Sequence, residues 1–303
     1  MLTTLSANNL AAIWAKRLSG TPTRIVIRQA STMSMNLAGG GDEFEKRILP
    51  VARRWYPDAD GIVAVSEGAA ADLASAAKID DDRITTIYNP VRLAQIDRLS
   101  AIPLNDPWFE GNGPPVILSL GRLDTAKDYP TLLKAFAKVT AERPSRLLII
   151  GEGKLRPQLL EICDALGLQS KVRFPGMDKN PFRYLKRADL FVLSSAWEGF
   201  PNALLEAMAC GVSVVSTDCQ SGPREILEDG RYGTLVPVGD ADALARAMLH
   251  SLTRQHCSKA DLRQRASAFS ETKITSDYLN LLLPREKAAV LEDSNPDLKG
   301  SAH

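Results

Sequence analysis

The sequence predicts an α/β protein made of two Rossmann-like, doubly wound domains, of which the first is incomplete. The chain has 303 residues, enough for two domains of roughly 100–200 residues each, and 45% of its residues are apolar. Short β-branched runs alternate with segments of 3.6-residue periodicity, which is typical of parallel sheets covered by helices on both faces. A proline-rich stretch separates an irregular first part from a regular second part.

The first domain is expected at residues 1–95 and contains only three predicted strands. These strands are 24–28, 61–65 and 83–87, and the expected helices are 8–18, 43–56 and 67–77. Because such domains usually run to about 150–200 residues, we expect about 100 residues of a usual first domain, including its opening strands, to be absent. The sheet edge left open predicts poor solubility or self-association through that edge.

The second domain is expected at 115–283, after a linker at 96–114. The linker lies in a stretch, 89–114, that carries four prolines and a Gly-Asn-Gly turn. The predicted strands are 116–120, 146–150, 171–174, 190–194, 213–216 and 232–236, and the predicted helices are 128–141, 154–167, 181–187, 202–210, 222–229, 240–254 and 271–283. This alternation is that of a complete doubly wound domain. Residues 284–303 lack periodicity and are predicted to form a flexible tail.

Composition argues against several classes of function. Lys and Arg number 37 against 36 Asp and Glu, so the net charge of +1 gives no overall field that would favour nucleic acid or an anionic membrane. The four cysteines form no CxxC pair and the three histidines lack metal-ligand spacing, which argues against a disulfide framework and a structural zinc site. No window reaches the ~18 apolar residues that a membrane span needs. We therefore expect a cytoplasmic protein.

The first motif with chemical meaning is SLGRLDTAKDYPTLLKAF, residues 119–136. Gly121 ends a predicted strand, Arg122 and Lys127 follow in the loop, and Asp128 is placed to cap the next helix. Ligands bind at the carboxyl ends of parallel strands, so two cations beside a helix N-terminus are suited to a diphosphate. On these residues alone, the alternative that both are solvated loop cations stays open.

Two glycine turns follow. GEG at 151–153 lacks the full GxGxxG spacing of a phosphate loop, so a tight strand-to-helix turn is the favoured interpretation. FPGM at 174–177 exposes backbone groups that can hydrogen-bond to the edge of a flat base, although by itself it is an ordinary loop.

The segment WEGFPNALLEAMACG, residues 197–211, sets Glu198 and Glu206 eight positions apart. Asn202 is the expected N-cap of its helix, with Glu206 in the first or second turn. The two acids either complement the helix dipole or bind a ligand. The apolar neighbours of Glu206 favour a ligand, because a buried carboxylate needs a partner such as sugar or ribose hydroxyl groups.

Taken in order, GRLDTAK, GEG, FPG, EGFPNALLEA, MACGVSVVS, GPREIL and GTLVPVGD resemble the nucleotide-sugar half of the retaining GT-B glycosyltransferases of family 4. The likeness covers about 114–283, and residues 24–100 resemble the later part of that family's acceptor domain. It implies a GT-B-like fold and a hexosyltransferase of polysaccharide or glycolipid biosynthesis. The implied donor is a nucleotide sugar, with UDP-sugars favoured, and the implied acceptor is a glycan or a lipid-linked molecule. The configuration of the sugar would be retained.

The resemblance also implies roles for single residues. Arg122 and Lys127, beside Gly121, would hold the donor diphosphate and neutralise the leaving nucleotide. Glu198 would contact the transferred sugar and Glu206 the ribose. The backbone of Gly176 and Met177 would face the base. The remaining implied donor contacts are the turn and helix start formed by Gly199, Phe200, Pro201, Asn202, Ala203 and Leu204. No metal ion and no other cofactor is expected.

The sequence departs from the family pattern in its first domain. The family normally carries a histidine ahead of the helix expected at 8–18, and residues 1–12 hold none. A second hypothesis is therefore a catalytically weak nucleotide-sugar-binding module, or a fragment, that needs a partner for its acceptor side. A third, a GT-B epimerase or phosphorylase, lacks its expected histidines or cofactor lysine context. In CGVSVVS, Ser213 stands where the family often has proline, which we expect to be a mild change.

A basic cluster lies on the helix expected at 43–56. Its members are Lys46, Arg47, Arg53 and Arg54. They form either a solvated helix face or a peripheral contact with lipid phosphates at the inner face of a membrane, and the nearby acids favour the solvated face.

Overall fold

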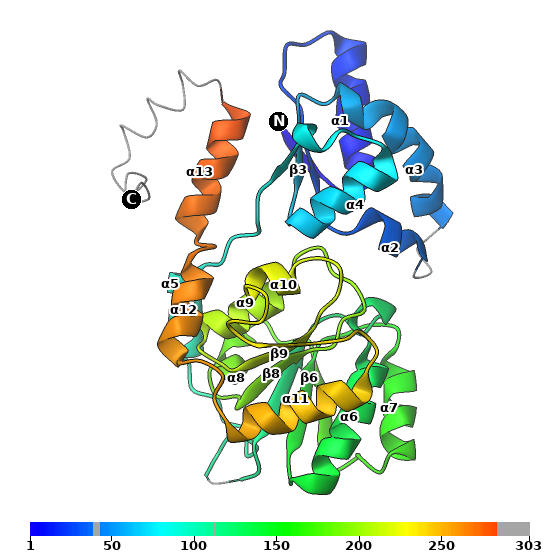
Figure 1. The fold of residues 1–303 in the computed structure, drawn as a ribbon. Helices are drawn as coiled ribbons and strands as arrows, with labels where there is room; N and C mark the ends of the chain where they lie inside the picture. The colour runs from blue at the N-terminus through cyan, green and yellow to red at the C-terminus, as the bar shows by residue number, and fades with distance from the viewer. Residues whose placement is uncertain (39–42, 112, 284–303) are drawn as a thin grey trace. The chain divides into compact units, whose positions relative to one another are not determined.

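In the computed structural model the chain forms two units, each built on a parallel sheet (Figure 1). The structure describes residues 1–38, 43–111 and 113–283. Unit 1 comprises Met1–Pro90, Glu198–Phe200 and the segment from Phe269 onward, and unit 2 comprises Val91–Trp197 and Pro201–Ala268. The division thus follows Pro90, five residues before the expected end of the first domain. The tail expected at 284–303 lies outside the described residues.

Unit 1 is built on a sheet with the strand order β1-β2-β3-β4, in which all neighbours are parallel. Its strands are β1 (Leu2–Thr4), β2 (Val26–Gln29), β3 (Gly61–Ala64) and β4 (Ile84–Thr86). Its helices are α1 (Ser6–Ser19), α2 (Met33–Ala38), α3 (Glu43–Trp55), α4 (Glu67–Ala77) and α13 (Glu271–Leu282), with 3-10 turns at Tyr56–Asp58 and Asp81–Arg83.

The strand β1 corrects the expectation of three strands in this part of the chain. Leu2, Thr3 and Thr4 pair with Val26, Ile27 and Arg28 of β2. A three-residue strand at a sheet edge is too short for an alternating pattern to identify it, and it is followed within two residues by α1. The described sheet therefore begins with a strand that precedes the first helix.

The two faces of this sheet are covered by different helices. One face packs on α1, α3 and α4, through a core that includes Ile13, Ile27 and Leu73. The other face packs on α13, where Ile274 contacts a cluster with Val26 and Val63. The helix expected at 271–283 therefore belongs to unit 1, whereas the sequence pattern placed it with the second domain.

Unit 2 is built on a six-stranded parallel sheet with the order β10-β9-β8-β5-β6-β7. Its strands are β5 (Val116–Leu120), β6 (Arg146–Ile150), β7 (Val172–Gly176), β8 (Leu190–Leu193), β9 (Val214–Thr217) and β10 (Thr234–Val236). Its helices are α5 (Leu93–Ser100), α6 (Tyr129–Glu142), α7 (Arg156–Ala165), α8 (Phe182–Leu185), α9 (Asn202–Ala209), α10 (Pro223–Ile226), α11 (Ala241–Thr253) and α12 (Lys259–Ser267), with a 3-10 turn at Thr125–Lys127.

Helices cover this sheet on both sides, as a doubly wound fold requires. One layer contains α11, α6 and α7, which lie next to one another (Figure 1). Its core joins Leu132, Phe136 and Met248 to Ile117 and Leu147 of the sheet. The other layer contains α5, α8, α9 and α12, which contact one another in turn.

Two parts of unit 2 differ from the sequence prediction. The expected linker at 96–114 overlaps α5, because the segment Leu93–Ser100 carries an amphipathic pattern whose Ile96 is buried. The helix α12 was also not predicted, because its sequence is strongly polar and only Leu262 and Ala266 are buried. In the described part of the chain, every helix is too short or too polar to cross a bilayer.

Candidate functional site

The strand order of unit 2 places a topological switch point between β5 and β8. From β5 the chain moves to β6 and β7 on one side, and then to β8, β9 and β10 on the other. In open parallel sheets a crevice forms outside the carboxyl ends of the strands at such a point, and ligands bind there. The loops that follow β5, β6, β7 and β8 therefore define the candidate site.

The loop after β5 carries both expected cations. The Arg122 side chain is 81% exposed and its Nη2 lies 3.1 Å from Asp124 Oδ2. Lys127 ends a 3-10 turn and is partly buried. Asp128 follows with φ 43° and its carboxylate accepts a hydrogen bond from the Thr131 N–H at 3.3 Å, so it is the N-cap of α6 as expected.

This loop is tied to the segment that follows β8. The Ser194 hydroxyl donates to the Lys127 carbonyl at 2.7 Å, and the Ala196 N–H donates to the Ala126 carbonyl at 2.7 Å. Residues that are more than 60 positions apart in sequence therefore meet at the switch point. No spacing or composition signal in the sequence singles out Ser194, because the contact follows from the adjacency of β5 and β8.

Glycines let the loops after β5 and β6 approach closely. A Cβ on Gly151 would lie 1.9 Å from the Gly121 carbonyl oxygen, and a Cβ on Gly153 would lie 2.3 Å from the Leu123 carbonyl oxygen. The Leu123 N–H donates to the Glu152 carbonyl at 2.9 Å. The GEG turn thus packs against residues 121–128, the loop after β5 that carries Arg122 and Lys127 and is called the cation loop below. This contact fits the interpretation of GEG as a tight structural turn.

The end of β7 carries the residues expected beside the base. Gly176 has φ 88°, and its carbonyl accepts a hydrogen bond from the Gly151 N–H at 3.0 Å. The Met177 side chain is 76% exposed. Within residues 1–38, 43–111 and 113–283, the Met177 N–H and C=O make no hydrogen bond, so both are open to a ligand.

The segment after β8 differs in one detail from the expectation. The N-cap of α9 is Pro201, with φ −79° and ψ 90°, and Asn202 is the first helical residue rather than the cap. No side chain caps α9. A helix start without a side-chain cap leaves N–H groups that can bind an anion. Ala203 and Leu204 continue this first turn, with the Leu204 N–H bonded to the Pro201 carbonyl at 3.0 Å.

Glu206 lies in α9 between the buried residues Leu205 and Ala207. Burial raises the pKa of Glu206 to about 7. Among the described residues its carboxylate has no ion pair and no hydrogen bond. A partly buried carboxylate without a protein partner is suited to accept hydrogen bonds from hydroxyl groups of a ligand.

Glu198, Gly199 and Phe200 are counted with unit 1 by their contacts, although they lie between β8 and α9 in sequence. The Ser66 hydroxyl donates to the Gly199 carbonyl at 2.7 Å. The Phe200 ring lies 5.4 Å from the ring of Tyr88, centroid to centroid. The remaining expected residues, Gly121, Arg122, Lys127, Gly176, Met177, Pro201, Asn202, Ala203, Leu204 and Glu206, belong to unit 2.

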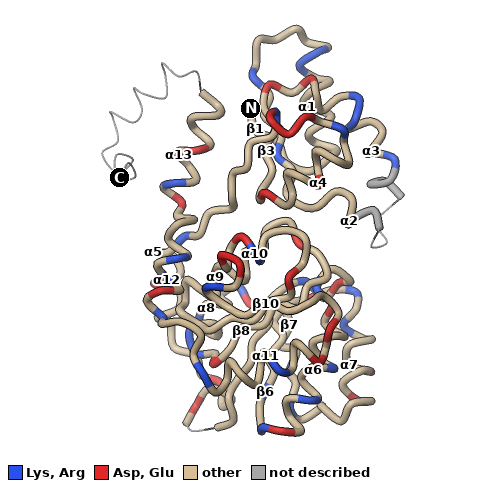
Figure 2. Tube along the Cα trace, viewed as in Figure 1, with Lys and Arg blue, Asp and Glu red and all other residues tan. Residues whose placement is uncertain are grey.

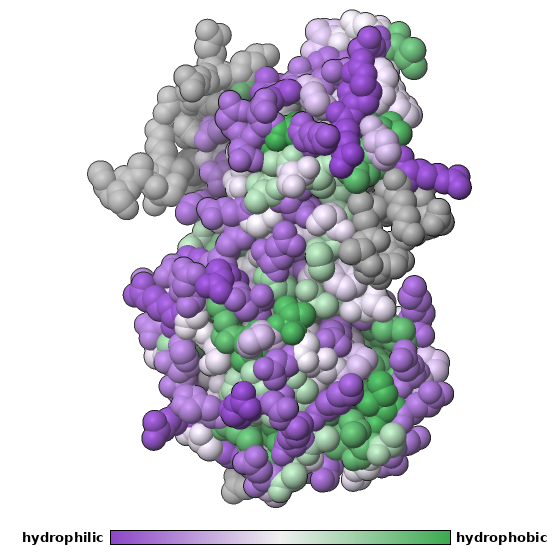
Figure 3. Space-filling model, turned by 45° about the vertical axis from the view of Figure 1, so that its right-hand side comes forward, coloured by the Kyte–Doolittle hydropathy of each residue, from purple (hydrophilic) through white to green (hydrophobic). Residues whose placement is uncertain are grey.

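The described side chains of the basic cluster expected on α3 are all exposed, and two of them have contacts within unit 1. The Arg53 Nε donates to the Ala76 carbonyl at 2.7 Å, and the Arg54 guanidinium lies 4.8 Å from the centre of the Trp55 ring. Arg47 is exposed, and the side chain of Lys46 lies outside the described residues. Basic and acidic residues are interspersed along both units (Figure 2). Hydrophilic residues predominate on the face shown in Figure 3, with hydrophobic residues in smaller areas between them.

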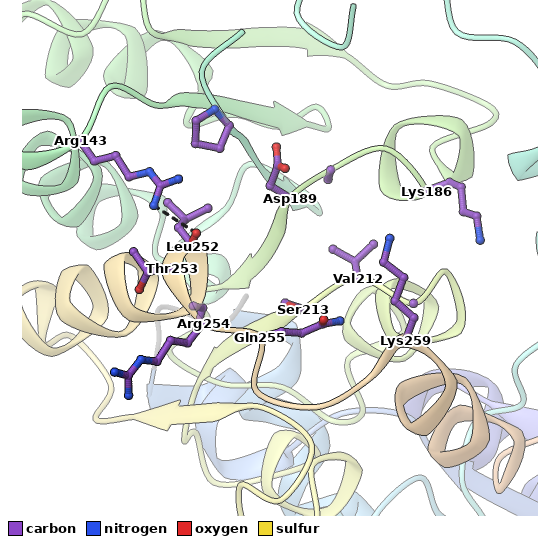
Figure 4. Close-up of a pocket in the computed structure, with 14 residues that line it drawn as sticks. Arg143, Lys186, Asp189, Val212, Ser213, Leu252, Thr253, Arg254, Gln255 and Lys259 are labelled. Atoms are coloured by element: carbon purple, nitrogen blue, oxygen red, sulfur yellow. Dashed lines mark hydrogen bonds between the residues drawn. The ribbon is translucent and has the colours of Figure 1, made fainter. Parts of the chain in front are cut away.

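A hollow lies at the amino ends of β5, β8 and β9, the end of the unit 2 sheet opposite to the candidate site (Figure 4). It has a volume of about 290 Å³ and is lined by Arg143, Lys186, Asp189, Arg254 and Lys259, among others. The C-terminal turn of α11 ends there, and Arg143 Nη1 donates to the Leu252 carbonyl at 3.1 Å. Cations at a helix C-terminus offset the helix dipole, so this hollow has a structural explanation and is not the candidate site.

Within the part of the chain that the structure describes, no three His, Cys, Asp or Glu side chains are grouped to hold a metal ion. The candidate site contains Arg122 and Lys127, the start of α9 without a side-chain cap, the Met177 backbone groups and the Glu206 carboxylate of raised pKa.

Comparison with known proteins gives matches over nearly the whole chain. The sequence profile described as "Glycosyl transferases group 1" matches residues 105–270, and that described as "Glycosyltransferase Family 4" matches residues 7–95. The chain is 34% identical to N-acetylgalactosamine-N,N'-diacetylbacillosaminyl-diphospho-undecaprenol 4-alpha-N-acetylgalactosaminyltransferase of Campylobacter jejuni, over 92% of this chain and 74% of that protein. Two other curated relatives are matched over about half of their own length.

Solved structures share the fold. The apo lipopolysaccharide outer core galactosyltransferase WaaB has a TM-score of 0.71 at 23% identity, covering 93% of this chain and 74% of that one. The Anabaena protein HepE, in complex with UDP-glucose, has a TM-score of 0.73 at 19% identity, covering 97% of this chain and 79% of that one.

Proposed function

Because the chain belongs to the glycosyl transferases group 1 family, with a GT-B fold, we propose that it moves a sugar from a nucleotide-sugar donor to a glycan or lipid-linked acceptor. UDP-sugars are the favoured donors, and the configuration of the sugar is retained. The observation that carries the proposal is the grouping of Arg122, Lys127 and the uncapped start of α9 at the switch point of unit 2.

The named relatives support this choice of substrates. The Campylobacter protein is named for a diphospho-undecaprenol acceptor, and HepE was solved with UDP-glucose. The acceptor and the ligand named here belong to those two proteins. They make lipid-linked acceptors and UDP-sugars the first substrates to test with this chain. The comparisons do not favour the alternative of a catalytically weak nucleotide-sugar-binding module, or fragment, that needs a partner for its acceptor side.

In the proposed mechanism, positively charged groups stabilise the negative charge that develops on the leaving nucleotide. Arg122 and Lys127 hold the diphosphate and stabilise the nucleotide as the glycosidic bond breaks. The first N–H groups of α9 face the same anion. Glu206 accepts hydrogen bonds from the ribose, and the Gly176–Met177 backbone binds the base.

Glu198 is proposed to contact the transferred sugar, with Gly199 and Phe200 in the same turn. The bond from the anomeric carbon to the diphosphate breaks and the bond to the acceptor oxygen forms on the same face of the sugar, while the acceptor's hydroxyl proton passes to the leaving diphosphate. The anomeric configuration is therefore kept without a covalent intermediate on the protein. The two cations and the helix start supply the charge that a metal ion supplies in other transferases, so the proposal includes no metal ion.

Peripheral membrane contact through α3 and a cytoplasmic location are part of the proposal. They are supported by the exposed position of Arg47 and by the lipid-linked acceptor in the name of the Campylobacter protein. Self-association through β1 is proposed as well, because β1 is the last strand of its sheet among the described residues and a strand edge with unpaired N–H and C=O groups can pair with another chain. Gel filtration that gives a monomer would rule out this last part.

A donor panel tests the proposal. Thermal unfolding is followed with UDP-, GDP- and other nucleotide sugars for the unmodified protein and for Glu206→Ala and Arg122→Ala. A donor at 100 times its Kd stabilises the folded state by about 2.7 kcal/mol, so one nucleotide should raise the Tm clearly in the unmodified protein and less in each variant. If no nucleotide diphosphate raises the Tm, the assignment of the site is wrong.

A further inference from the structure

The cation loop is held at the switch point by a buried hydroxyl group. Ser194 is 1% exposed, and its Oγ donates to the Lys127 carbonyl at 2.7 Å. The next segment is held as well, because the Thr217 hydroxyl of β9 donates to the Ser195 carbonyl at 2.6 Å. The Lys127 backbone is thus linked through Ser194 to a segment that is itself fixed to the neighbouring strand.

The strands themselves do not hold this loop. The pairing between β5 and β8 joins Ile117 to Leu190 and Leu118 to Phe191, and in the part of the chain that the structure describes these two strands form no later pair. Lys127 lies seven positions after the end of β5, in a 3-10 turn that has no side-chain cap at its start. The bonds from Ser194 to the Lys127 carbonyl and from Ala196 to the Ala126 carbonyl join this turn to the segment that follows β8.

We infer that Ser194 is a positioning residue that sets the place of Lys127 relative to the start of α9. The inference rests on the proposed function, in which Lys127 and α9 bind one diphosphate from two sides. Ser194 does not touch the ligand. It acts through the Lys127 carbonyl, and a misplacement of about 1 Å in a binding group is enough to weaken a charged contact strongly.

Ser119 provides a matched control within the same pair of strands. It is 2% exposed, and its Oγ donates to the Val192 carbonyl at 2.8 Å. Both serines are buried, and each joins the β5 and β8 sides through a hydroxyl-to-carbonyl bond. Only the bond from Ser194 reaches the loop that carries the cations.

The experiment compares Ser194→Ala, Ser119→Ala and the unmodified full chain. Amide hydrogen exchange of residues 122–128 reports on the tether, UDP affinity measured by calorimetry reports on the site, and kcat and KM are measured with the donor found active in the panel. For Ser194→Ala we expect exchange of 122–128 to become about tenfold faster and UDP affinity to fall about tenfold, the effect of losing about 1.4 kcal/mol. Ser119→Ala should leave both unchanged while losing a similar amount of stability.

The outcomes either support or contradict the role of Ser194. Equal effects of the two variants, or unchanged exchange or UDP affinity in Ser194→Ala, would overturn the inference. Ser194→Thr keeps the hydroxyl and should retain the exchange behaviour of the unmodified protein if Ser194→Ala proves hard to purify. An unmodified protein that binds no UDP and transfers no sugar would instead contradict the proposed function, whereas the exchange measurement would still report on the tether.

Discussion

Glu206 combines a cost in stability with a proposed role in binding. Burial in α9 raises its pKa from the ordinary 4.5 to about 7. Below pH 4.5 the carboxyl group is protonated in both the folded and the unfolded chain, so it costs nothing. As the pH rises from 4.5 to 7, the unfolded chain ionises first and the folded state loses stability. Above pH 7 the loss is complete.

The size of this loss follows from the pKa. Each pH unit between the two values corresponds to about 1.4 kcal/mol, so ionised Glu206 costs unit 2 roughly 3 kcal/mol above pH 7. Glu206→Gln removes the charge and keeps the shape. Its free energy of unfolding should equal that of the unmodified protein near pH 4 and exceed it by roughly 3 kcal/mol at pH 8.

Guanidinium unfolding curves at pH 4, 6 and 8 measure this difference directly. Comparing the two proteins at each pH cancels the titration of all other groups. Glu161→Gln, at an exposed position of α7, is the control and should differ from the unmodified protein by no more than about 0.5 kcal/mol at any pH. The reasoning fails if Glu206→Gln is not stabilised at pH 8, or if the gain does not shrink toward acid pH.

The same variant should bind UDP less well. A hydroxyl group that donates to a charged acceptor gains about 1.5–3 kcal/mol, so replacing the carboxylate with an amide should weaken UDP binding by about tenfold or more. A more stable protein with a weaker site is the expected combination when a residue is kept for binding rather than for folding.

Three further predictions concern Arg122, the glycines at the ends of β5 and β6, and the effect of removing metal ions on the transfer rate. Arg122→Ala should change stability by less than about 0.5 kcal/mol, because the side chain is 81% exposed and its ion pair with Asp124 lies at the surface. UDP affinity measured by calorimetry should nevertheless fall at least about tenfold. Gly121→Ala should lower donor affinity, since its new Cβ would lie 3.1 Å from Lys127 Cε. Gly151→Ala should instead lower the free energy of unfolding in urea by more than about 2 kcal/mol, because its Cβ would lie 1.9 Å from a backbone oxygen. EDTA should leave the transfer rate unchanged, and a loss that Mg²⁺ or Mn²⁺ restores would contradict the proposed charge arrangement.

The second unit was largely predictable because its strands are buried on both faces. Runs such as VILSL and RLLII have no polar face and stand between amphipathic helices, so the period of the pattern changes clearly at each boundary. The first unit gives weaker signals. β1 is short and lies at an edge, and α2 spans only six residues. The placement of α13 could not be read from sequence, because an amphipathic helix does not reveal which sheet its apolar face covers.

The candidate site was predictable in its charged residues but not in its supports. Arg122, Lys127 and Glu206 stand out because of their residue types and their positions after strands or inside an apolar helix. Ser194 and Thr217 are ordinary residues in sequence, and their importance depends on the order of strands in the sheet. Sequence patterns predict where each strand ends. The contacts between the loops after β5 and β8 can be predicted only when the order of the strands in the sheet is known.

The return of α13 to the sheet of unit 1 has a consequence for how the protein can be divided experimentally. Apart from the short excursion at Glu198–Phe200, unit 2 is inserted between two stretches of unit 1, with junctions at Pro90 and at Ala268. A segment from Val91 to Ala268 keeps the core of α6, α7 and α11 intact, whereas a segment that stops at Pro90 exposes the apolar face formed by Val26, Val63 and Ile87. Exchange of donor specificity between relatives should therefore be attempted as a cassette spliced at both junctions, and not as a simple fusion of front and back halves.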